Sequence, residues 1–493
     1  MSKNHSFSLD KLLVFLSILY VTIPVLVFFF GWLKEAVALF AAVPFFFFVY
    51  FVCKDIIETE TKLFTKETYI YWIIAIAVIC IWVYFSGIGA FSFQNGDHWV
   101  RNPIYRDLCS YRWPVIYDLS KEPAFVQSIT GSDPVAFSYY FTFWLVPALI
   151  SKVFGLSELG CNIILFLWSV TGLLLILYNM NRIIGKCSVG SLLMLVFFSG
   201  MDILRCVYYG KPYQFIEHIE WWGDLYRIQY SSNTTQLYWV FNQSIPLWLI
   251  ICLTYQLQSN KYLGALYALS FAYSPWAIFG VIPIALVGSF SKKQNICQVF
   301  NLINIITTLL TAGIYGLFYV ASSGSSGGIG TTLSYYRTRL FGFLIDYFIF
   351  VLTEFILYWL FVYKEKKNDK YFWIVSMELL LFPMVWMRDG NFTMRASIPA
   401  LFIFMLYIIE TMNRIETKSK IVLTAMLLIG SLTPISEINR SIKNTLIGNY
   451  DNEEEIYSFG NIQTRNEARI KIVKDQFFIY DYNESIFFKS LGK

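Results

Sequence analysis

Long apolar stretches recur along this chain and are separated by short polar breaks. Leu12–Gly31, Tyr69–Ser86, Cys161–Tyr178 and Ile421–Leu432 carry few or no ionisable side chains. A helix needs about 20 apolar residues to cross the hydrocarbon core, where every backbone polar group must find its partner within the protein. The pattern therefore predicts an all-α, polytopic integral membrane protein. The first stretch lacks a small-residue cleavage site, so it is expected to be a retained span and not a signal peptide.

Hydropathy and polar breaks together predict about 13 transmembrane helices. The predicted spans are 12–32, 36–53, 69–87, 159–181, 188–206, 238–256, 262–274, 275–290, 298–320, 339–363, 371–387, 396–411 and 421–438. The pair at 262–290 is short for two crossings. Ser274-Pro275 is therefore either a sharp turn between half-length helices or a break within one element.

The distribution of basic residues predicts the orientation. With the N-terminus in the cytoplasm, the inner segments carry 17 lysines and arginines and the short outer loops carry 8. This asymmetry favours a cytoplasmic N-terminus. An odd number of crossings then places the C-terminal tail outside.

The predicted spans and their orientation, together called the threading below, divide the chain into three parts. They are an N-terminal transmembrane hairpin at 1–68, appended to a transmembrane core at 69–438, and an extracytoplasmic tail at 439–493. The core carries long outer loops at 88–158 and 206–237. Within the first loop, 134–155 is apolar but interrupted by Lys152, which favours an amphipathic helix lying in the outer interface over a further crossing.

Composition agrees with this class and excludes others. The chain is 57% hydrophobic and only 14% charged, whereas soluble domains carry roughly 25% charged residues. A net charge of +5 is too small to suggest a nucleic-acid partner. The eight cysteines are scattered without a CxxC motif, and there are only three histidines, so no metal site built from cysteine and histidine is predicted.

The first long loop carries the most suggestive acid. Asp97 lies about ten residues beyond a predicted span, near the headgroup level where a lipid-linked substrate would present its sugar. A carboxylate there can accept a proton from an attacking hydroxyl or bind a divalent cation. Arg101 and Arg106 are candidate phosphate ligands, and His98 a candidate sugar or acceptor contact. The alternative is an interfacial loop whose acids and bases pair with each other.

Two later segments add candidate ligands. Aromatic side chains mixed with amides and carboxylates suit sugars, and the candidate sugar or acceptor contacts here are Glu220, Trp221, Trp222, Asn242 and Gln243. An ordinary interfacial aromatic belt is the competing interpretation. Farther along, Arg388 and Arg395 flank Asp389 between two apolar helices, and their guanidinium forks suit a lipid phosphate or pyrophosphate.

Two carboxylates, Glu354 and Glu378, fall inside predicted spans. A charge in hydrocarbon is costly, so both are expected to face a polar cavity or a partner and not lipid. Proton- or ion-coupled transporters also use such residues.

The arrangement of an inner N-terminus, a long outer loop with an acid soon after a span, and an interfacial helix resembles the GT-C superfamily of polytopic membrane glycosyltransferases. More narrowly, Gly87–Trp113, Trp221–Pro246 and Asn391–Pro399 look like an uncharacterised bacterial family of GT-C-like membrane proteins. The resemblance in topology covers most of the chain. Two features depart from the superfamily: three early spans precede the first long loop, and no Asp-x-Asp or Glu-x-Asp pair stands at Asp97.

The resemblance implies a glycosyltransferase at the outer face of the bacterial cytoplasmic membrane. It would move a sugar from a polyprenyl-phosphate-linked donor to a cell-envelope glycan or lipid acceptor. Asp97 matches the first-loop acid that serves as base or metal ligand in the superfamily, and the missing acidic pair favours a metal-free base over Mg²⁺ or Mn²⁺. A transporter or polymerase of lipid-linked glycans, or a non-catalytic membrane assembly factor, is the alternative.

Overall fold

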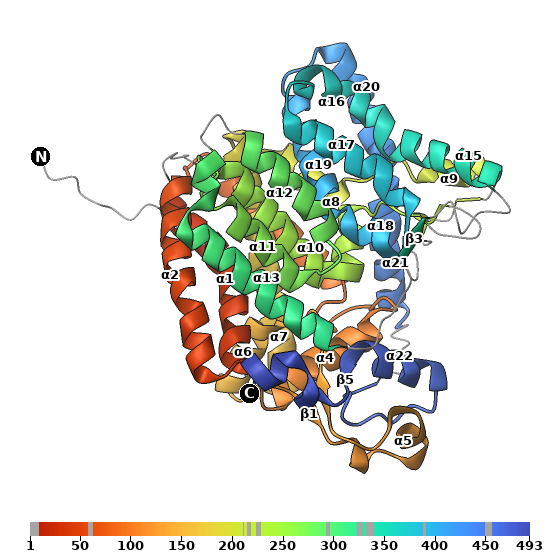
Figure 1. Ribbon diagram of the computed structural model, residues 1–493. Helices are drawn as coiled ribbons and strands as arrows, with labels where there is room; N and C mark the ends of the chain where they lie inside the picture. Colours follow the sequence, from red (N-terminus) through yellow and green to blue (C-terminus); the bar gives the residue numbers. More distant parts are fainter. Residues whose placement is uncertain are drawn as a thin grey trace, which may run out of the picture.

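The structure is a computed structural model of the chain (Figure 1). It describes residues 9–57, 63–210, 212–213, 218–222, 228–291, 296–322, 329–331, 340–387, 391–448 and 456–493. Arg388, one of the arginines expected to bind phosphate, lies outside the described residues, as does most of the glycine- and serine-rich segment 322–328.

Seven of the described helices are long and apolar enough to cross a membrane. They are α1 (Leu9–Trp32), α2 (Glu35–Ile57), α7 (Glu158–Ile184), α10 (Asn233–Gln256), α13 (Leu302–Ala321), α15 with α16 (Leu340–Val351 and Leu357–Lys366), and α20 with α21 (Thr417–Gly430 and Leu432–Leu446). Shorter apolar helices pack among them: α3 (Tyr69–Phe85), α11 (Leu263–Tyr273), α12 (Ile278–Ser291) and α19 (Ile398–Met412).

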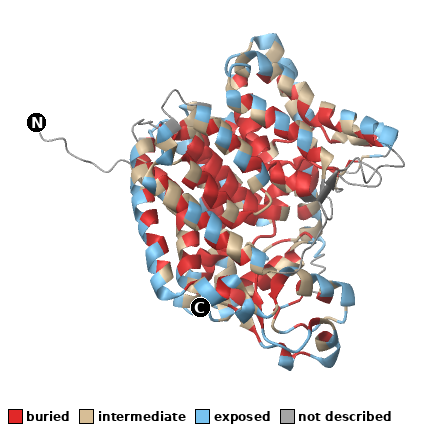
Figure 2. Ribbon diagram, viewed as in Figure 1, coloured by how far each residue is buried: buried red, intermediate tan, exposed pale blue. Residues whose placement is uncertain are grey.

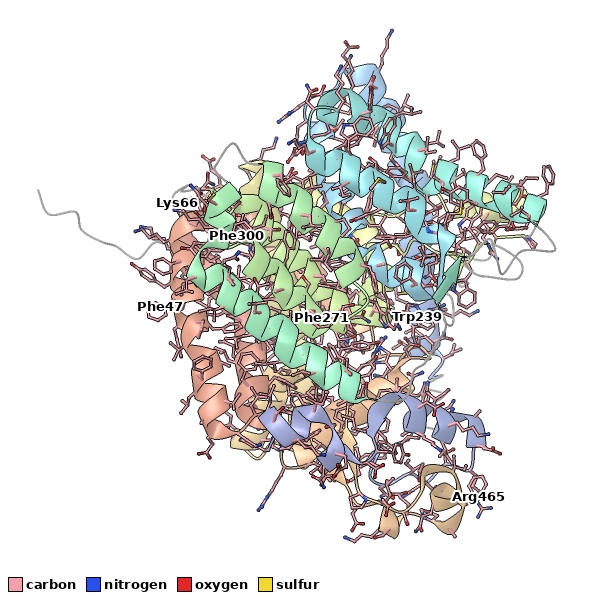
Figure 3. All side chains as sticks on the ribbon, viewed as in Figure 1. Phe47, Lys66, Trp239, Phe271, Phe300 and Arg465 are labelled. Carbon is pink, nitrogen blue, oxygen red and sulfur yellow. The ribbon has the colours of Figure 1, made fainter. Side chains whose placement is uncertain are left out.

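Large apolar side chains point outward from this helical body. Phe40, Phe46 and Phe47 on α2 are 72%, 66% and 51% exposed, and Phe47 lies on the outer edge of the molecule (Figure 3). Figure 2 shows the same contrast between a buried interior and an exposed rim. Soluble proteins rarely expose apolar surface so continuously, whereas acyl chains cover it without cost. The chain is therefore a multi-pass α-helical membrane protein.

The expected count of 13 crossings is not supported. The predicted span 188–206 holds only α8 (Val189–Phe197), an irregular segment and α9 (Ile203–Tyr208). The predicted span 371–387 holds α17 (Lys370–Leu381) and then strand β4 (Val385–Met387). Pro383 follows α17 and cannot continue its hydrogen-bond ladder. Neither segment holds a continuous helix of the length that a crossing needs.

Helix α10 lies at the centre of the helical body. It packs against α1, α7, α11 and α19. Within its most apolar stretch of 18 residues, 94% of the residues are buried in the protein. At the crossing with α7, a Cβ on Gly172 would lie 2.4 Å from the Tyr20 hydroxyl and 2.6 Å from Ile245, so only glycine permits this approach. Helix α1 packs against α2, as the predicted hairpin requires, but it also contacts α7 and α10 and is part of the body.

A second layer covers one end of the body. The first long loop contributes α4 (His98–Ser110), α5 (Ala124–Thr130) and α6 (Leu145–Val153), and the tail contributes α22 (Glu467–Phe477) (Figure 1). Loop strands β1 (Ile116–Tyr117) and β2 (Val135–Phe137) join tail strand β5 (Phe478–Ile479) in one antiparallel sheet, with Ile116 opposite Ala136 and Ala136 opposite Ile479. Nine residues make α6 too short to cross a bilayer. The predicted helix over 134–155 is found only at α6, because β2 occupies the start of that range.

The tail also reaches the turn between α1 and α2. The Lys34 amide donates to the Leu491 carbonyl at 2.9 Å, and the Lys493 amide donates to the Trp32 carbonyl at 2.9 Å. The first loop, the tail and this turn therefore share one end of the molecule, as the threading requires. In Figure 3, Arg465 in the tail lies at this end, whereas Lys66 and Phe300 lie at the opposite one.

Candidate functional site

The N-terminus of α4 presents a carboxylate held by an arginine. Asp97 immediately precedes the helix, and its side chain accepts from Arg101 Nη2 at 2.8 Å, one helical turn later. Arg101 is 3% exposed, whereas the Asp97 side chain is 42% exposed. The buried guanidinium therefore orients a carboxylate that solvent or a substrate can reach.

An amide network fixes the start of this helix. Gln94 and Asn102 exchange side-chain hydrogen bonds at 2.8 and 3.2 Å, and Gln94 Nε2 lies 3.1 Å from His98 Nδ1. Burial and the nearby charge of Arg101 lower the pKa of His98 to about 3, so its ring is neutral. His98 was expected to contact sugar or acceptor, but it is 1% exposed and packs against Phe241, 6.0 Å away. It therefore positions the helix that carries Asp97.

Two arginines distant in sequence act on one tyrosine in the first loop. Burial raises the pKa of Tyr139 well above its usual range, and the positive charges of Arg395 and Arg101 both oppose that rise. Arg101 also lies over the Phe241 ring, 5.6 Å from its centroid. Tyr139 is therefore within electrostatic range of both guanidinium groups. The convergence of Asp97 and Arg395 on one cavity stays a prediction.

The second loop supplies a buried acid that caps α10. Glu220 accepts hydrogen bonds from the Ser232 amide at 2.9 Å and the Thr235 hydroxyl at 2.6 Å, at the start of α10. Burial raises the pKa of Glu220 to about 7, against the opposing charge of His218. A carboxylate at a helix N-terminus stabilises the helix dipole. Glu220 therefore has a structural role at the start of α10. Its position is explained without the predicted contact with sugar.

The tryptophans of this loop divide by burial. Trp222 is fully buried, and its Nε1 donates to Asp202 at 3.2 Å, so it belongs to the core. Trp221 is half-buried and lies beside His218, with ring centroids 4.6 Å apart. Trp239 flanks the same imidazole at 5.7 Å. Trp221 and Trp239 are therefore half-buried aromatic side chains that lie beside His218.

An ion-pair network joins the second loop to α21 and back to the first loop. His218 Nδ1 lies 2.8 Å from Glu437 Oε1, and Arg440 Nη2 lies 2.7 Å from Glu437 Oε2. Burial opposes the charged imidazole, but Glu437 outweighs it and raises the pKa of His218. Arg440 also donates to Asn95 at 2.7 Å, two residues before Asp97.

Sequence reasoning missed Glu437 and Arg440, although a usable signal was present. Glu437 falls inside the predicted span 421–438, and the cost of a carboxylate in hydrocarbon applies to it as it does to Glu354.

The two carboxylates expected to avoid lipid are both in the interior. Glu354 and Glu378 are each 4% exposed, and none of their carboxylate oxygens has a hydrogen-bond partner among the described residues. Glu354 lies on a π-helical turn between α15 and α16, close enough to Asp202 for the two charges to interact. A Cβ on Gly200 would lie 1.8 Å from Glu354 Oε2. Both side chains therefore face protein.

The amides expected to contact sugar lie deep within α10. The helix is interrupted at Val240, where φ is −140° and ψ is 36°. Asn242 is buried with neither side-chain polar atom partnered among the described residues, and Gln243 accepts from the Ser274 hydroxyl at 2.7 Å. Ser274 begins the turn between α11 and α12, so Ser274-Pro275 separates two short helices.

Arg106 stands apart from this group, near the other end of α4. Its Nε pairs with Glu158 at 2.8 Å, and its guanidinium lies over the Tyr457 ring, 4.5 Å from the ring centroid.

Within the ranges that the structure describes, no three His, Cys, Asp or Glu side chains are grouped so that they could hold a metal ion. No family model, no curated protein and no solved structure matches the chain.

Proposed function

We propose that this protein is a membrane glycosyltransferase that moves a sugar from a polyprenyl-phosphate-linked donor to a cell-envelope glycan or lipid acceptor. One observation carries the proposal. An accessible carboxylate, Asp97, is held at 2.8 Å by the buried guanidinium of Arg101 at the start of α4. Such a grouping supplies a proton acceptor and a cation for a leaving phosphate, the two requirements of this transfer.

The reaction assigns a separate task to each group. Asp97 accepts the proton of the acceptor hydroxyl, and the acceptor oxygen forms a bond to the anomeric carbon. The bond between that carbon and the phosphate oxygen breaks, and the phosphate leaves with the electron pair. Arg395 stabilises the charge that develops on it. Arg101 holds the carboxylate in position, and the half-buried Trp221 and Trp239 offer faces against which a sugar ring can stack.

A transporter of lipid-linked glycans is the second candidate, and α10 favours it. Discontinuous helices with buried polar groups form the substrate sites of many transporters. The interruption at Val240, the Asn242 amide, which has no partner among the residues that the structure describes, and the interior carboxylate of Glu354 follow that pattern.

The decisive experiment measures sugar transfer by the purified full-length protein. Short-chain polyprenyl-phosphate sugars with a radiolabelled sugar are offered with envelope glycans and lipids as acceptors. Asp97→Asn is expected to abolish transfer, because the side chain keeps its size and loses its basicity. Asp133→Asn, at an exposed aspartate of the same loop, is the matched control and is expected to keep wild-type turnover.

A second variant tests the cation. Arg395→Lys keeps the charge but loses the forked geometry, so it is expected to raise the KM for the donor more than it lowers kcat. Full transfer by Asp97→Asn would refute the catalytic assignment. Movement of a fluorescent lipid-linked glycan across proteoliposomes without any transfer would support the transporter instead.

A further inference from the structure

Two carboxyl groups that take no part in the proposed transfer meet in the interior of the helical body. Asp202 precedes α9, and Glu354 lies on the π-helical turn between α15 and α16. One residue before each acid, the Met201 amide donates to the Thr353 carbonyl at 3.4 Å and holds the two segments side by side. A Cβ on Gly200 would lie 1.8 Å from Glu354 Oε2, so the Glu354 carboxyl group lies directly against the segment that carries Asp202.

The surroundings of Asp202 favour an ionised carboxylate. Its side chain is buried with 0% exposure. Its Oδ2 accepts from the Ser199 and Thr433 hydroxyls, each at 3.1 Å, and its Oδ1 accepts from Trp222 Nε1 at 3.2 Å. Hydrogen bonds donated to a carboxylate stabilise its charged form. Asp202 is therefore the charged member of the pair.

The surroundings of Glu354 are the opposite. It is 4% exposed, and neither of its carboxyl oxygens has a hydrogen-bond partner among the residues that the structure describes. It nevertheless lies within hydrogen-bonding reach of Asp202. An ionised carboxylate only accepts hydrogen bonds, so two ionised carboxylates cannot bond to each other, whereas a protonated one is a donor. A proton on Glu354 therefore supplies the bond that its position otherwise lacks.

No positive charge compensates the pair within the described part of the chain. The other titratable groups that face it are Glu220, Tyr230 and Tyr358, and the ionised form of each is negative. The imidazole of His218, which interacts with Glu220, is already paired with Glu437 at 2.8 Å. Two adjacent carboxyl groups removed from water cannot both ionise without a cation, so one of them holds a proton.

We propose that Asp202 and Glu354 bind one proton between them at neutral pH, carried by Glu354 and donated to Asp202. The pair is then a proton-binding site inside the membrane protein, on a π-helical turn of the kind found frequently at functional sites. Release of the proton leaves two negative charges side by side, which repel each other across the contact between the turn and the segment before α9. The proposal uses no residue assigned to sugar transfer, and either can fail alone.

Infrared spectroscopy of the purified full-length protein tests for this proton directly. A carboxylic acid has a carbonyl stretching band that a carboxylate lacks. At pH 7 in sodium-free buffer, the wild type is expected to show the band of Glu354, and Glu354→Gln is expected to lose it. Any band of Glu378 is common to both proteins and cancels in the difference spectrum. Glu410→Gln, at a carboxylate paired with Lys366, is the matched control and is expected to leave the carboxylic-acid region unchanged.

A second variant tests whether the proton is shared. Asp202→Asn is expected to shift the Glu354 band without removing it, because the proton is then donated to a neutral oxygen and the hydrogen bond weakens. This variant keeps Glu354, so it tests the pair even where Glu354→Gln folds poorly. A wild type without the Glu354 band, or a band that Asp202→Asn leaves in place, would overturn the proposal. Loss of the wild-type band on addition of sodium would identify a sodium site and would overturn it as well.

Discussion

Asp107 fastens the C-terminal tail to the first long loop, and its titration should loosen that attachment. The side chain is 1% exposed, and its Oδ2 accepts from the Tyr117 hydroxyl at 2.7 Å and from the Phe459 amide at 2.9 Å. Burial raises the pKa of Asp107 from 3.8 to about 6, although these hydrogen bonds and Arg106 partly oppose the shift. The folded state therefore binds a proton more tightly than the unfolded tail does.

The sign and size of the effect follow from this difference. The stabilising contribution of the protonated carboxyl is fully present below about pH 4 and is lost as pH rises through about 6. A shift of roughly two pKa units corresponds to about 3 kcal/mol of attachment free energy. Asp107→Asn mimics the neutral form and keeps an oxygen that accepts hydrogen bonds. It is expected to hold the tail more firmly than the wild type at neutral pH and to remove most of the pH dependence.

Hydrogen–deuterium exchange read by mass spectrometry measures this attachment directly. Exchange of the peptides that contain Phe459 and strand β5 is followed between pH 4 and 7.5 and corrected with unfolded peptides. At pH 7.5 the variant is expected to exchange up to about a hundredfold more slowly than the wild type.

Asp118→Asn is the control, because Asp118 is exposed on the same loop and its ordinary pKa is lowered by Ser120 and Lys121. Glu122 contributes a second dependence of the same sign, since its buried carboxylate accepts from the Ile462 amide at 2.8 Å and burial raises its pKa. If Asp107→Asn kept the full wild-type change in exchange between pH 4 and 7, the reasoning about this carboxyl would be wrong.

Three other predictions concern stability and titration. Gly200→Ala drives a methyl group against Glu354 and is expected to lower the unfolding free energy in detergent by about 1–3 kcal/mol. The control is Gly313→Ala, which should be nearly neutral because a Cβ there meets no atom within 4 Å. Equal stability of the two variants would contradict the packing argument. Glu437→Gln leaves the buried His218 and the half-buried Arg440 without a counter-charge and is expected to cost about 3–5 kcal/mol in the same denaturation assay. Wild-type stability would show that the network is not an ion-paired one. Because the pKa of His98 is about 3, His98→Gln is expected to leave the shape of the pH–rate profile between pH 5 and 8 unchanged, and the loss of an inflection there would refute its neutrality.

Local sequence features bear on two parts of the site. Asp97 and Arg101 stand four residues apart, and their ion pair corresponds to the alternative in which acids and bases of the first loop pair with each other. Glu354 and Glu378 were expected to avoid lipid, and their burial agrees with the cost of a charge in hydrocarbon. In the first case the two partners lie within one helical turn. In the second case the cost of placing one carboxylate in hydrocarbon is enough to predict that it is buried in protein.

Contacts between distant segments were beyond the same reasoning. His98 and Trp222 look like polar-surface aromatics in sequence, yet both are buried, because α4 packs on α10 and the second loop folds over Asp202. The pairing of His218 with Glu437 joins residues 219 positions apart. The hydrophobic periodicity of the sequence cannot predict such a pairing, because the pairing depends on how the helices cross in the folded protein.

The sequence by itself determined that this chain is an α-helical membrane protein, because continuous apolar segments of span length admit few other ways to satisfy the backbone. Only the tertiary structure decided which apolar helices meet lipid and which, like α10, are enclosed by others. It alone attached the tail to the first loop through β2 and β5 and paired His218 with Glu437 and Arg440 with Glu437. The physical reason is that burial by protein and burial by lipid favour the same apolar side chains, so hydropathy cannot distinguish them, whereas helix packing can.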